Sequence, residues 1–259
     1  MPTPLTACII TFNEEERIAA CLRSVAFCDE ILVVDSHSTD ATRAIASELG
    51  ARVIARDWPG YAAQKELAVR EAAHDWVLCI DADEWVSEPL RAEIVALRDS
   101  EFRGAAGFEI PRCTRYLGAW IRHGTWYPDA QLRLFDRRRG AWVSPHALGV
   151  HEHVELDGRS KRLQNDLLHE PYRSLSEHLV TIDRYTTQIA EGMFASGRLA
   201  RLDQIVLTPA AEFLRFYLLK RGFLDGWRGL LLAYLHAHYV RMKYAKLMAL
   251  ERRGADLSP

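Results

Sequence analysis

Four short apolar segments, separated by segments with helical spacing, occupy the first hundred residues. The apolar segments are ACIITF, EILVVDS, ARVIARD and DWVLCIDAD, at 7–12, 30–36, 51–57 and 75–83. Helices are expected after Asn13, which can cap the first of them, and over 44–49, 64–73 and 89–97. Strands that are apolar throughout are typical of a parallel sheet covered on both faces. The sequence therefore predicts an α/β fold of the nucleotide-binding type.

Polar residues stand at the ends of three of these strands, at 11–13, 35–38 and 81–84. In open parallel sheets, ligands bind outside the carboxyl ends of the strands. We therefore expect a ligand site along that edge of the sheet.

The stretch DWVLCIDADEW, residues 75–85, leads a buried strand directly into acidic residues. Asp81 and Asp83 project to the same side where strand geometry persists, and carboxylates that close repel unless a cation lies between them. Mg²⁺ or Mn²⁺ binds oxygen ligands, commonly one or two carboxylates together with substrate phosphates. The pair indicates a divalent-metal and diphosphate site. A helix cap or a solvated loop is the alternative for an isolated D-x-D.

Cysteine usage and hydropathy indicate a cytoplasmic protein. The five cysteines are odd in number and show no CxxC spacing, so we expect neither a disulfide framework nor a zinc site. The longest uncharged run near the C-terminus, 229–240, has 12 residues. A bilayer-spanning helix needs about 20 residues, so we expect no transmembrane segment.

Three motifs in order, TFNEEERIAACLRSV, VVDSHSTDAT and DWVLCIDADEW, resemble family 2 glycosyltransferases of the GT-A fold. The later segments YLGAWIRHGTWYPDAQLRLF, VHEHVEL and LLHEPYRS are similar to the subgroup of bacterial lipopolysaccharide core β-glucosyltransferases. The resemblance implies a Rossmann-like GT-A catalytic domain over 1–173 with a helical extension over 174–259. The nucleotide-sugar half would be about 1–104 and the acceptor half about 105–173.

The resemblance also assigns site residues. It implies that Phe12, Asn13 and Glu14 line the nucleotide pocket and that Asp35 bonds the base or ribose. Asp81 and Asp83 would form the D-x-D that meets the ribose and, through a metal, the diphosphate, with His169 completing the metal shell. The further candidate contacts to the nucleotide sugar are Lys65, Gln131 and Arg133.

Two pairs of neighbouring residues depart from the family pattern. Ser36 and His37 stand where many members have Asp and Gly, which leaves the identity of the base open. Lys65 and Glu66 stand where Arg and Asn are common, so Lys65 would meet a diphosphate as a point charge, or would be an ordinary lysine of a helix surface.

An inverting transfer needs a base to take the proton of the attacking hydroxyl. Glu152 lies between two histidines among apolar residues and is the preferred candidate. Asp129, in WYPDAQ, is the second candidate.

The C-terminal part is basic, because residues 198–253 hold 11 Lys and Arg against 4 Asp and Glu. Basic amphipathic helices rich in Trp, Phe and Leu lie in membrane interfaces, attracted by anionic lipid. The alternative is a helical pair packed on the catalytic domain with a solvated basic face. Nucleic-acid binding is not expected, because no recognition motif accompanies the charge.

The sequence thus predicts a metal-dependent inverting glycosyltransferase, peripheral on the inner face of the cytoplasmic membrane. It would move a hexose, glucose, from a UDP-sugar to a lipid-linked saccharide such as the lipopolysaccharide inner core, forming a β-linkage. The alternatives are a transferase to a polyprenyl phosphate or protein acceptor, and a non-catalytic scaffold that binds sugar nucleotide or membrane.

Overall fold

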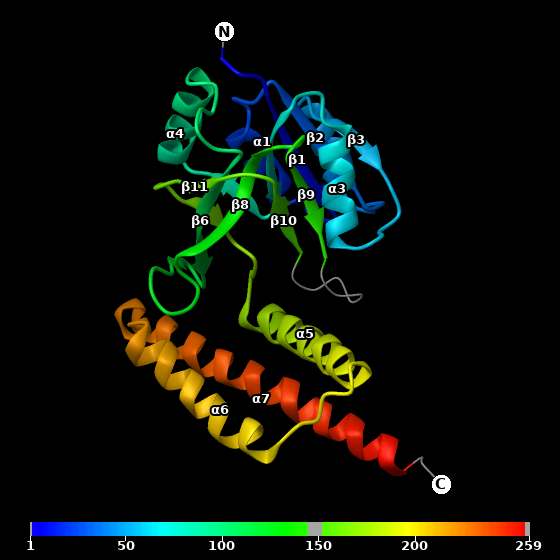
Figure 1. Ribbon diagram of the computed structural model, residues 1–259, viewed down its shortest axis with the longest axis vertical. Helices are drawn as coiled ribbons and strands as arrows, with labels where there is room; N and C mark the ends of the chain where they lie inside the picture. The colour runs from blue at the N-terminus through cyan, green and yellow to red at the C-terminus, as the bar shows by residue number, and fades with distance from the viewer. Residues whose placement is uncertain (1, 145–151, 257–259) are drawn as a thin grey trace. The chain divides into compact units, whose positions relative to one another are not determined.

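The computed structural model describes residues 2–144 and 152–256, and the chain divides into two compact units. The first unit comprises Met1–Cys113 and Asp129–Glu170, and the second comprises Thr114–Pro128 and Pro171–Pro259. Figure 1 shows the sheet in the first unit and the long helices in the second. The functional division at residue 173 stays a prediction.

The first unit begins with alternating strands and helices, as predicted. These are β1 (Leu5–Thr11), α1 (Ile18–Ser24), β2 (Glu30–Asp35), α2 (Thr42–Glu48), β3 (Arg52–Ala55), α3 (Tyr61–Glu71), β4 (Trp76–Asp81), β5 (Glu84–Val86) and α4 (Glu88–Asp99). Mostly extended segments follow: β6 (Gly107–Tyr116), β8 (Asp129–Asp136), β9 (Gly140–Val143), β10 (His153–Leu156), β11 (Ser160–Arg162) and β12 (Leu167–His169).

The sheet is mixed, with strand order β3-β2-β1-β4-β8-β6-β12-β5. The first four of these strands are parallel, and β8 joins β4 antiparallel. The register aligns Thr11 of β1 with Asp35 of β2, and Ile10 with Asp81 of β4. The polar ends of three strands therefore meet at one edge of the sheet, as predicted.

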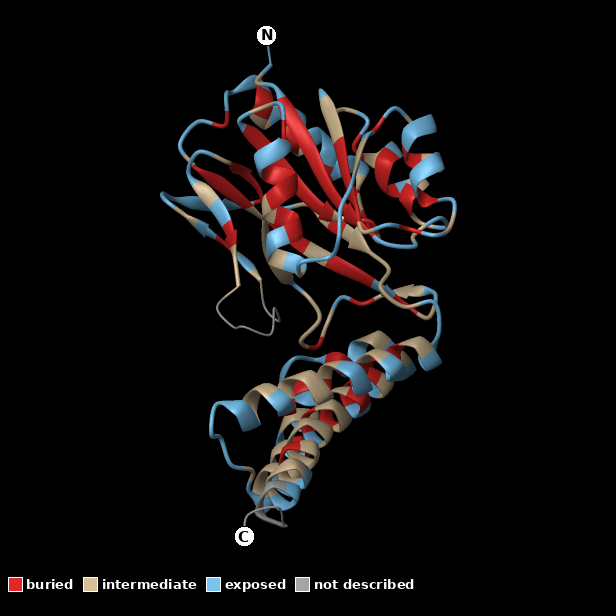
Figure 2. Cartoon of the chain, turned by 90° about the vertical axis from the view of Figure 1, so that its right-hand side faces the viewer, coloured by how far each residue is buried: buried red, intermediate tan, exposed pale blue. Residues whose placement is uncertain are grey.

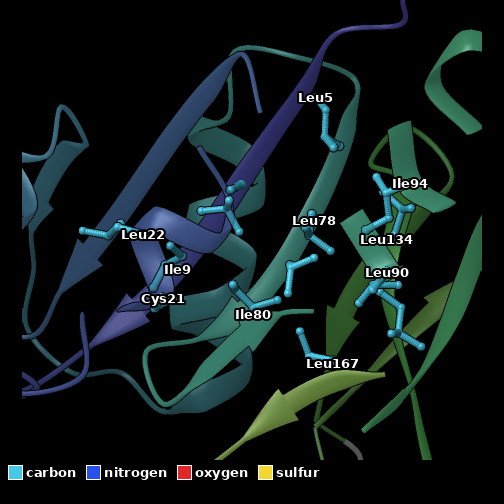
Figure 3. Close-up of a cluster of buried hydrophobic side chains, with 14 of the residues drawn as sticks. Leu5, Ile9, Cys21, Leu22, Leu78, Ile80, Leu90, Ile94, Leu134 and Leu167 are labelled. Carbon is cyan, nitrogen blue, oxygen red and sulfur yellow. The ribbon is translucent and has the colours of Figure 1, made fainter. Parts of the chain in front are cut away.

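The core lies on both faces of this sheet, because side chains alternate along each strand. Leu5 and Ile9 of β1 face the layer that contains α1 and α4 (Figure 3). Cys8 and Ile10 face the opposite layer, where α3 and the β9–β10 hairpin lie. Figure 2 shows the buried residues running along the central strands. This packing fixes the strand ends that carry the polar residues.

One local expectation is wrong: Asn13 does not cap the first helix. The helix begins at Ile18, and Asn13 adopts a left-handed backbone conformation with φ 55°. The Oδ1 atom of Asn13 instead accepts a hydrogen bond from the Thr39 backbone nitrogen at 2.8 Å, which joins the loops that follow β1 and β2.

The second unit is a helical bundle completed by the segment 114–128, which contains β7 (Ala119–Trp120). Its helices are α5 (Leu175–Ala195), α6 (Leu202–Leu214), the π-helical turn η1 (Arg215–Leu219), the 3₁₀ turn η2 (Gly222–Asp225) and α7 (Gly226–Asp256). α7 packs against both α5 and α6 around a core that includes Tyr116, Phe216 and Leu232. Within the described residues, no helix combines the length and apolarity that crossing a membrane requires.

Candidate active site

Asp81, the last residue of β4, is held between two cations. Its Oδ2 atom accepts a hydrogen bond from Arg133 of β8 at 2.9 Å, and its Oδ1 atom lies 3.1 Å from the Lys65 Nζ atom of α3. Burial alone raises the pKa of Asp81, but Lys65 and Arg133 outweigh it and hold that pKa well below its usual range. Asp81 is therefore ionised at every physiological pH.

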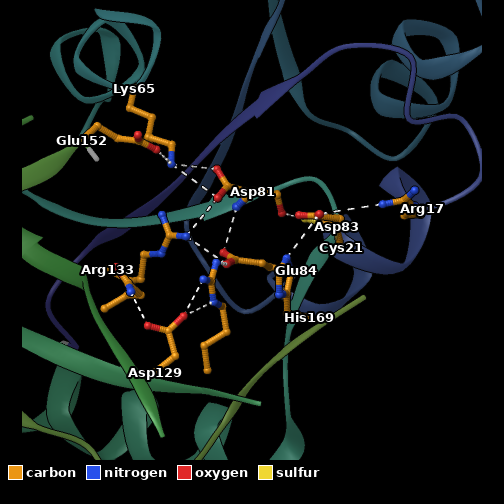
Figure 4. Close-up of polar contacts among 12 residues, drawn as sticks. Arg17, Cys21, Lys65, Asp81, Asp83, Glu84, Asp129, Arg133, Glu152 and His169 are labelled. Atoms are coloured by element: carbon orange, nitrogen blue, oxygen red, sulfur yellow. Dashed lines mark hydrogen bonds and ion pairs between the residues drawn. The ribbon is translucent and has the colours of Figure 1, made fainter. Parts of the chain in front are cut away.

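Lys65 also joins Asp81 to the preferred base. Its Nζ atom lies 3.1 Å from the Glu152 Oε1 atom (Figure 4). The same atom lies 4.8 Å from the centre of the Trp142 ring. The lysine is buried, so it is not the surface residue that the alternative reading expected. The structure thus brings Lys65, Asp81 and Glu152 together. No sequence motif selects Trp142, which lies on β9.

Glu84 of β5 orders the base of the site, a role that sequence reasoning missed. It is fully buried, and its Oε2 atom accepts a hydrogen bond from the Asp81 backbone nitrogen at 3.0 Å. Its Oε1 atom accepts from Arg133 at 2.9 Å and from Arg112 of β6 at 3.0 Å. A buried carboxylate is tolerated only with such partners. Its place directly after the D-x-D was the only available sequence signal.

Arg133 is buried, with 3% of its surface exposed, although alternation along a half-buried strand would turn it outward. The nearby acids Glu84 and Asp81 raise its pKa despite the opposing effect of burial, so it remains a fixed positive charge.

Asp129, the second candidate base, is tied to a guanidinium. It accepts a hydrogen bond from the Arg112 Nε atom at 3.0 Å, and its other oxygen accepts one from the Gln131 side chain at 2.6 Å. Burial raises the pKa of Asp129, but Arg112 and Gln131 more than offset it, and the pKa lies below its usual range. Asp129 is therefore a weak proton acceptor. The side-chain amide of Gln131, a candidate contact to the nucleotide sugar, is hydrogen-bonded to Asp129.

Asp83 has partners different from those of Asp81. The strand ends at Asp81, so the two carboxylates do not share the same surroundings (Figure 4). The Asp83 Oδ2 atom lies 3.4 Å from the His169 Nε2 atom and 3.7 Å from an Arg17 guanidinium nitrogen. His169 reaches this point because β12 pairs antiparallel with β5, which places it opposite Glu84.

Asp83 and His169 fit a divalent cation in part. Burial raises the pKa of Asp83, but His169 and Arg17 outweigh it and lower that pKa, so the carboxylate is ionised. A carboxylate oxygen and an imidazole nitrogen suit Mn²⁺ or Mg²⁺. Across residues 2–144 and 152–256, no group of three or more His, Cys, Asp or Glu forms a complete metal shell. A cation here would thus need oxygens from a bound substrate or water.

The loops after β1 and β2 are ordered by Asp35. This carboxylate is fully buried and accepts hydrogen bonds from the backbone nitrogen and hydroxyl of Ser38. The Ser38 hydroxyl accepts in turn from the Asn13 backbone nitrogen at 2.8 Å. The Glu14 backbone nitrogen donates to the Thr42 hydroxyl at 2.8 Å. Asn13, Glu14 and Asp35 thus belong to one connected loop structure.

Phe12 lies at the start of this loop structure with 55% of its surface exposed. Exposure of this extent excludes a role for Phe12 in simple core packing. Its ring is accessible for stacking.

Comparison with known proteins agrees with this geometry. The model of the family described as "Glycosyl transferase family 2" matches residues 6–153. The chain belongs to glycosyltransferase family 2. The matched segment contains the D-x-D and Glu152, and it ends before His169. The mixed sheet flanked by helices is therefore the GT-A architecture, as predicted, followed by C-terminal helices.

Relatives extend the similarity beyond the family domain. The chain is 30% identical over 258 residues to the lipopolysaccharide core biosynthesis glycosyltransferase LpsC of Rhizobium meliloti, and the alignment covers 93% of each protein. It is 28% identical over 257 residues to an uncharacterized glycosyltransferase of Rickettsia typhi, with 96% of this chain and 88% of the relative covered. Among solved structures, Staphylococcus aureus TarS 1–349 matches with a TM-score of 0.47 and 15% identity over 97% of this chain and 92% of that chain.

Proposed function

We propose that this family 2 glycosyltransferase is an inverting enzyme that transfers a hexose, glucose, from a UDP-sugar to a hydroxyl of a lipid-linked saccharide. The observation that carries the proposal is the cluster at the end of β4. There Asp81 and Asp83 lie with Lys65, Arg133 and His169 at the carboxyl edge of a parallel sheet.

The donor would lie along this edge. We propose that Phe12 stacks on the base and that the loop held by Asp35 receives the nucleoside. Asp83 and His169 would hold the divalent cation, which when bound supplies charge neutralisation for the diphosphate. Lys65 and Arg133 would add fixed positive charge beside Asp81, which favours departure of a diphosphate.

Glu152 is proposed as the base. It would take the proton of the acceptor hydroxyl while that oxygen attacks the anomeric carbon from the face opposite the diphosphate. The C–O bond to the acceptor forms as the bond to the diphosphate breaks, which turns an α-linked donor into a β-linked product. Asp129 is less suitable, because Arg112 and Gln131 engage both of its carboxylate oxygens, whereas Lys65 contacts the Oε1 atom of Glu152.

The acceptor proposal draws on LpsC, whose name assigns that relative to lipopolysaccharide core biosynthesis. A lipid-linked core saccharide is thus the proposed acceptor, at the inner face of the cytoplasmic membrane. The basic C-terminal part, which follows the matched family domain, is consistent with such a location.

The test is a panel of nucleotide sugars scored by thermal unfolding with and without Mn²⁺, followed by transfer assays. A donor at 100 times its dissociation constant should stabilise the fold by about 2.7 kcal/mol. The variant Asp83→Ala should lose the Mn²⁺-dependent part of this protection and lower transfer by about 100-fold or more. Asp99→Ala, an exposed acid of α4, is the matched control and should behave as wild type. Absence of any nucleotide-sugar protection would refute the proposed donor site.

A further inference from the structure

The outer face of α6 and η1 is apolar. Leu202, Val206, Leu214 and Leu218 follow one another at spacings of four or eight residues, and each is more than half exposed. Ala210, also exposed, fills the intervening position. Residues four apart are neighbours on a helix surface, so these side chains form one continuous stripe that winds along α6 and η1. Surface helices normally turn polar residues to water, and this stripe does the reverse.

The turn from η1 to α7 continues this surface. Its exposed apolar side chains are Leu219 at 79%, Phe223 at 45%, Leu224 at 54% and Trp227 at 58%. We call the stripe and these four residues together the apolar surface. Contiguous exposed apolar surface of this kind marks an interaction site rather than a chance distribution.

The turn is held in shape by hydrogen bonds within the second unit. The Lys220 carbonyl accepts a hydrogen bond from the Gly124 nitrogen at 2.8 Å, and Arg228 donates to the Leu117 carbonyl at 2.9 Å. A Cβ atom at Gly229 would lie 1.8 Å from the Gly222 carbonyl oxygen, so only glycine permits this close crossing. The exposed side chains are therefore presented by a fixed turn.

The charges beside the apolar surface are mostly cationic. Arg215, Lys220 and Arg221 are exposed there. Glu212 and Arg215 pair at 3.0 Å and offset each other, and Asp225 accepts a hydrogen bond from the His123 backbone nitrogen at 2.9 Å. Lys220 and Arg221 supply the remaining positive charge here. An apolar face bordered by Arg and Lys matches the boundary between anionic headgroups and acyl chains.

We propose that the apolar surface embeds in the interface of an anionic lipid bilayer, with Lys220 and Arg221 at the headgroups. This deepens the membrane location in the proposed function by naming the segment that meets the lipid. α7 contributes Trp227 at its start to this surface, and it also packs against α5 and α6.

The experiment is co-flotation of the full-length protein with vesicles of phosphatidylcholine containing phosphatidylglycerol. The double variant Leu219→Glu/Leu224→Glu should weaken binding by about tenfold or more, because two exposed leucines no longer enter the apolar phase. Val180→Glu, at a comparably exposed position of α5, is the matched control and should bind as wild type. Wild-type binding should weaken on vesicles of phosphatidylcholine alone.

Equal binding by the double variant and wild type would overturn the proposal, as would equal loss in Val180→Glu. Light scattering tests a different occupant, a second copy of this chain. If wild type is a dimer that does not bind vesicles, and the double variant is a monomer, this surface is an interface between two copies. Nucleotide-sugar protection against unfolding should be the same in both variants and wild type. If wild type binds vesicles but no nucleotide sugar protects it against unfolding, the proposed donor is refuted and this inference stands.

Discussion

At the residue scale, Lys65 shows what the structure adds to the motif. The sequence offered a positive charge near a diphosphate, and the structure places that charge against both Asp81 and Glu152. Removing a buried cation leaves its carboxylates without a counter-charge, which destabilises a site strongly. Lys65 therefore couples the proposed donor site to the proposed base. Its spacing along α3 gave no sign of the contact with Glu152, which lies 87 positions away in the chain.

The two candidate bases can be separated by conservative substitution. Glu152→Gln should lower kcat by about 100-fold or more, because general-base catalysis contributes 10²–10⁴-fold, while donor protection in thermal unfolding is preserved. Asp129→Asn should retain more activity, since Asp129 is engaged by Arg112 and holds its proton weakly. Steady-state kinetics with one donor and one acceptor decides. An active Glu152→Gln beside an inactive Asp129→Asn would exchange the two assignments.

At the element scale, local pattern predicted the parallel half of the sheet well. β1, β2 and β4 carry apolar runs, and each polar strand end lies where its apolar run stops. The antiparallel half was less accessible, because pairing between β5 and β12 joins segments some eighty residues apart without a local signal. That pairing brings His169 to Asp83. Glu84 was missed for the same reason, since both of its arginine partners come from distant strands.

α5 offers a pH-dependent test of the helical unit. Burial lowers the pKa of His178 to about 4, and its Nδ1 atom lies 2.9 Å from the Tyr116 hydroxyl. The unfolded chain binds a proton at this histidine near pH 6.5, whereas the folded chain binds it only near pH 4. The contribution of His178 to the free energy of unfolding is therefore fully present above pH 6.5. It falls as the pH decreases toward 4, by up to about 3 kcal/mol.

Chemical denaturation from pH 4 to 8 measures this dependence. His178→Asn, which removes the titrating group and keeps an amide near the Tyr116 hydroxyl, should flatten the profile between pH 6.5 and 4. His153→Asn replaces an exposed histidine and should leave the wild-type slope. An unchanged slope in His178→Asn would show that other groups govern the acid response.

At the scale of the whole molecule, the proposed donor contacts and the proposed membrane contacts belong to different units. The D-x-D, Lys65 and the loop of Asp35 lie in the first unit, and the apolar surface lies in the second. In the sequence, the N-terminal and C-terminal parts differ in net charge and in the spacing of their apolar residues. The sequence signal for a membrane contact was spread over 198–253, because composition does not reveal which helix face is covered by its neighbours.

This separation predicts two distinct footprints in hydrogen–deuterium exchange. UDP with Mn²⁺ should slow exchange in the loops 12–16 and 36–39 by about fivefold or more, because a bound ligand suppresses local opening. Segment 214–230 should be unaffected. Anionic vesicles should give the reverse pattern, protecting 214–230 and leaving both loops unchanged, since lipid contact involves exposed residues of the second unit alone. The Leu219→Glu/Leu224→Glu variant is the control, because it should lose only the vesicle footprint. Protection of both regions by either ligand would mean that the two contacts are not separate.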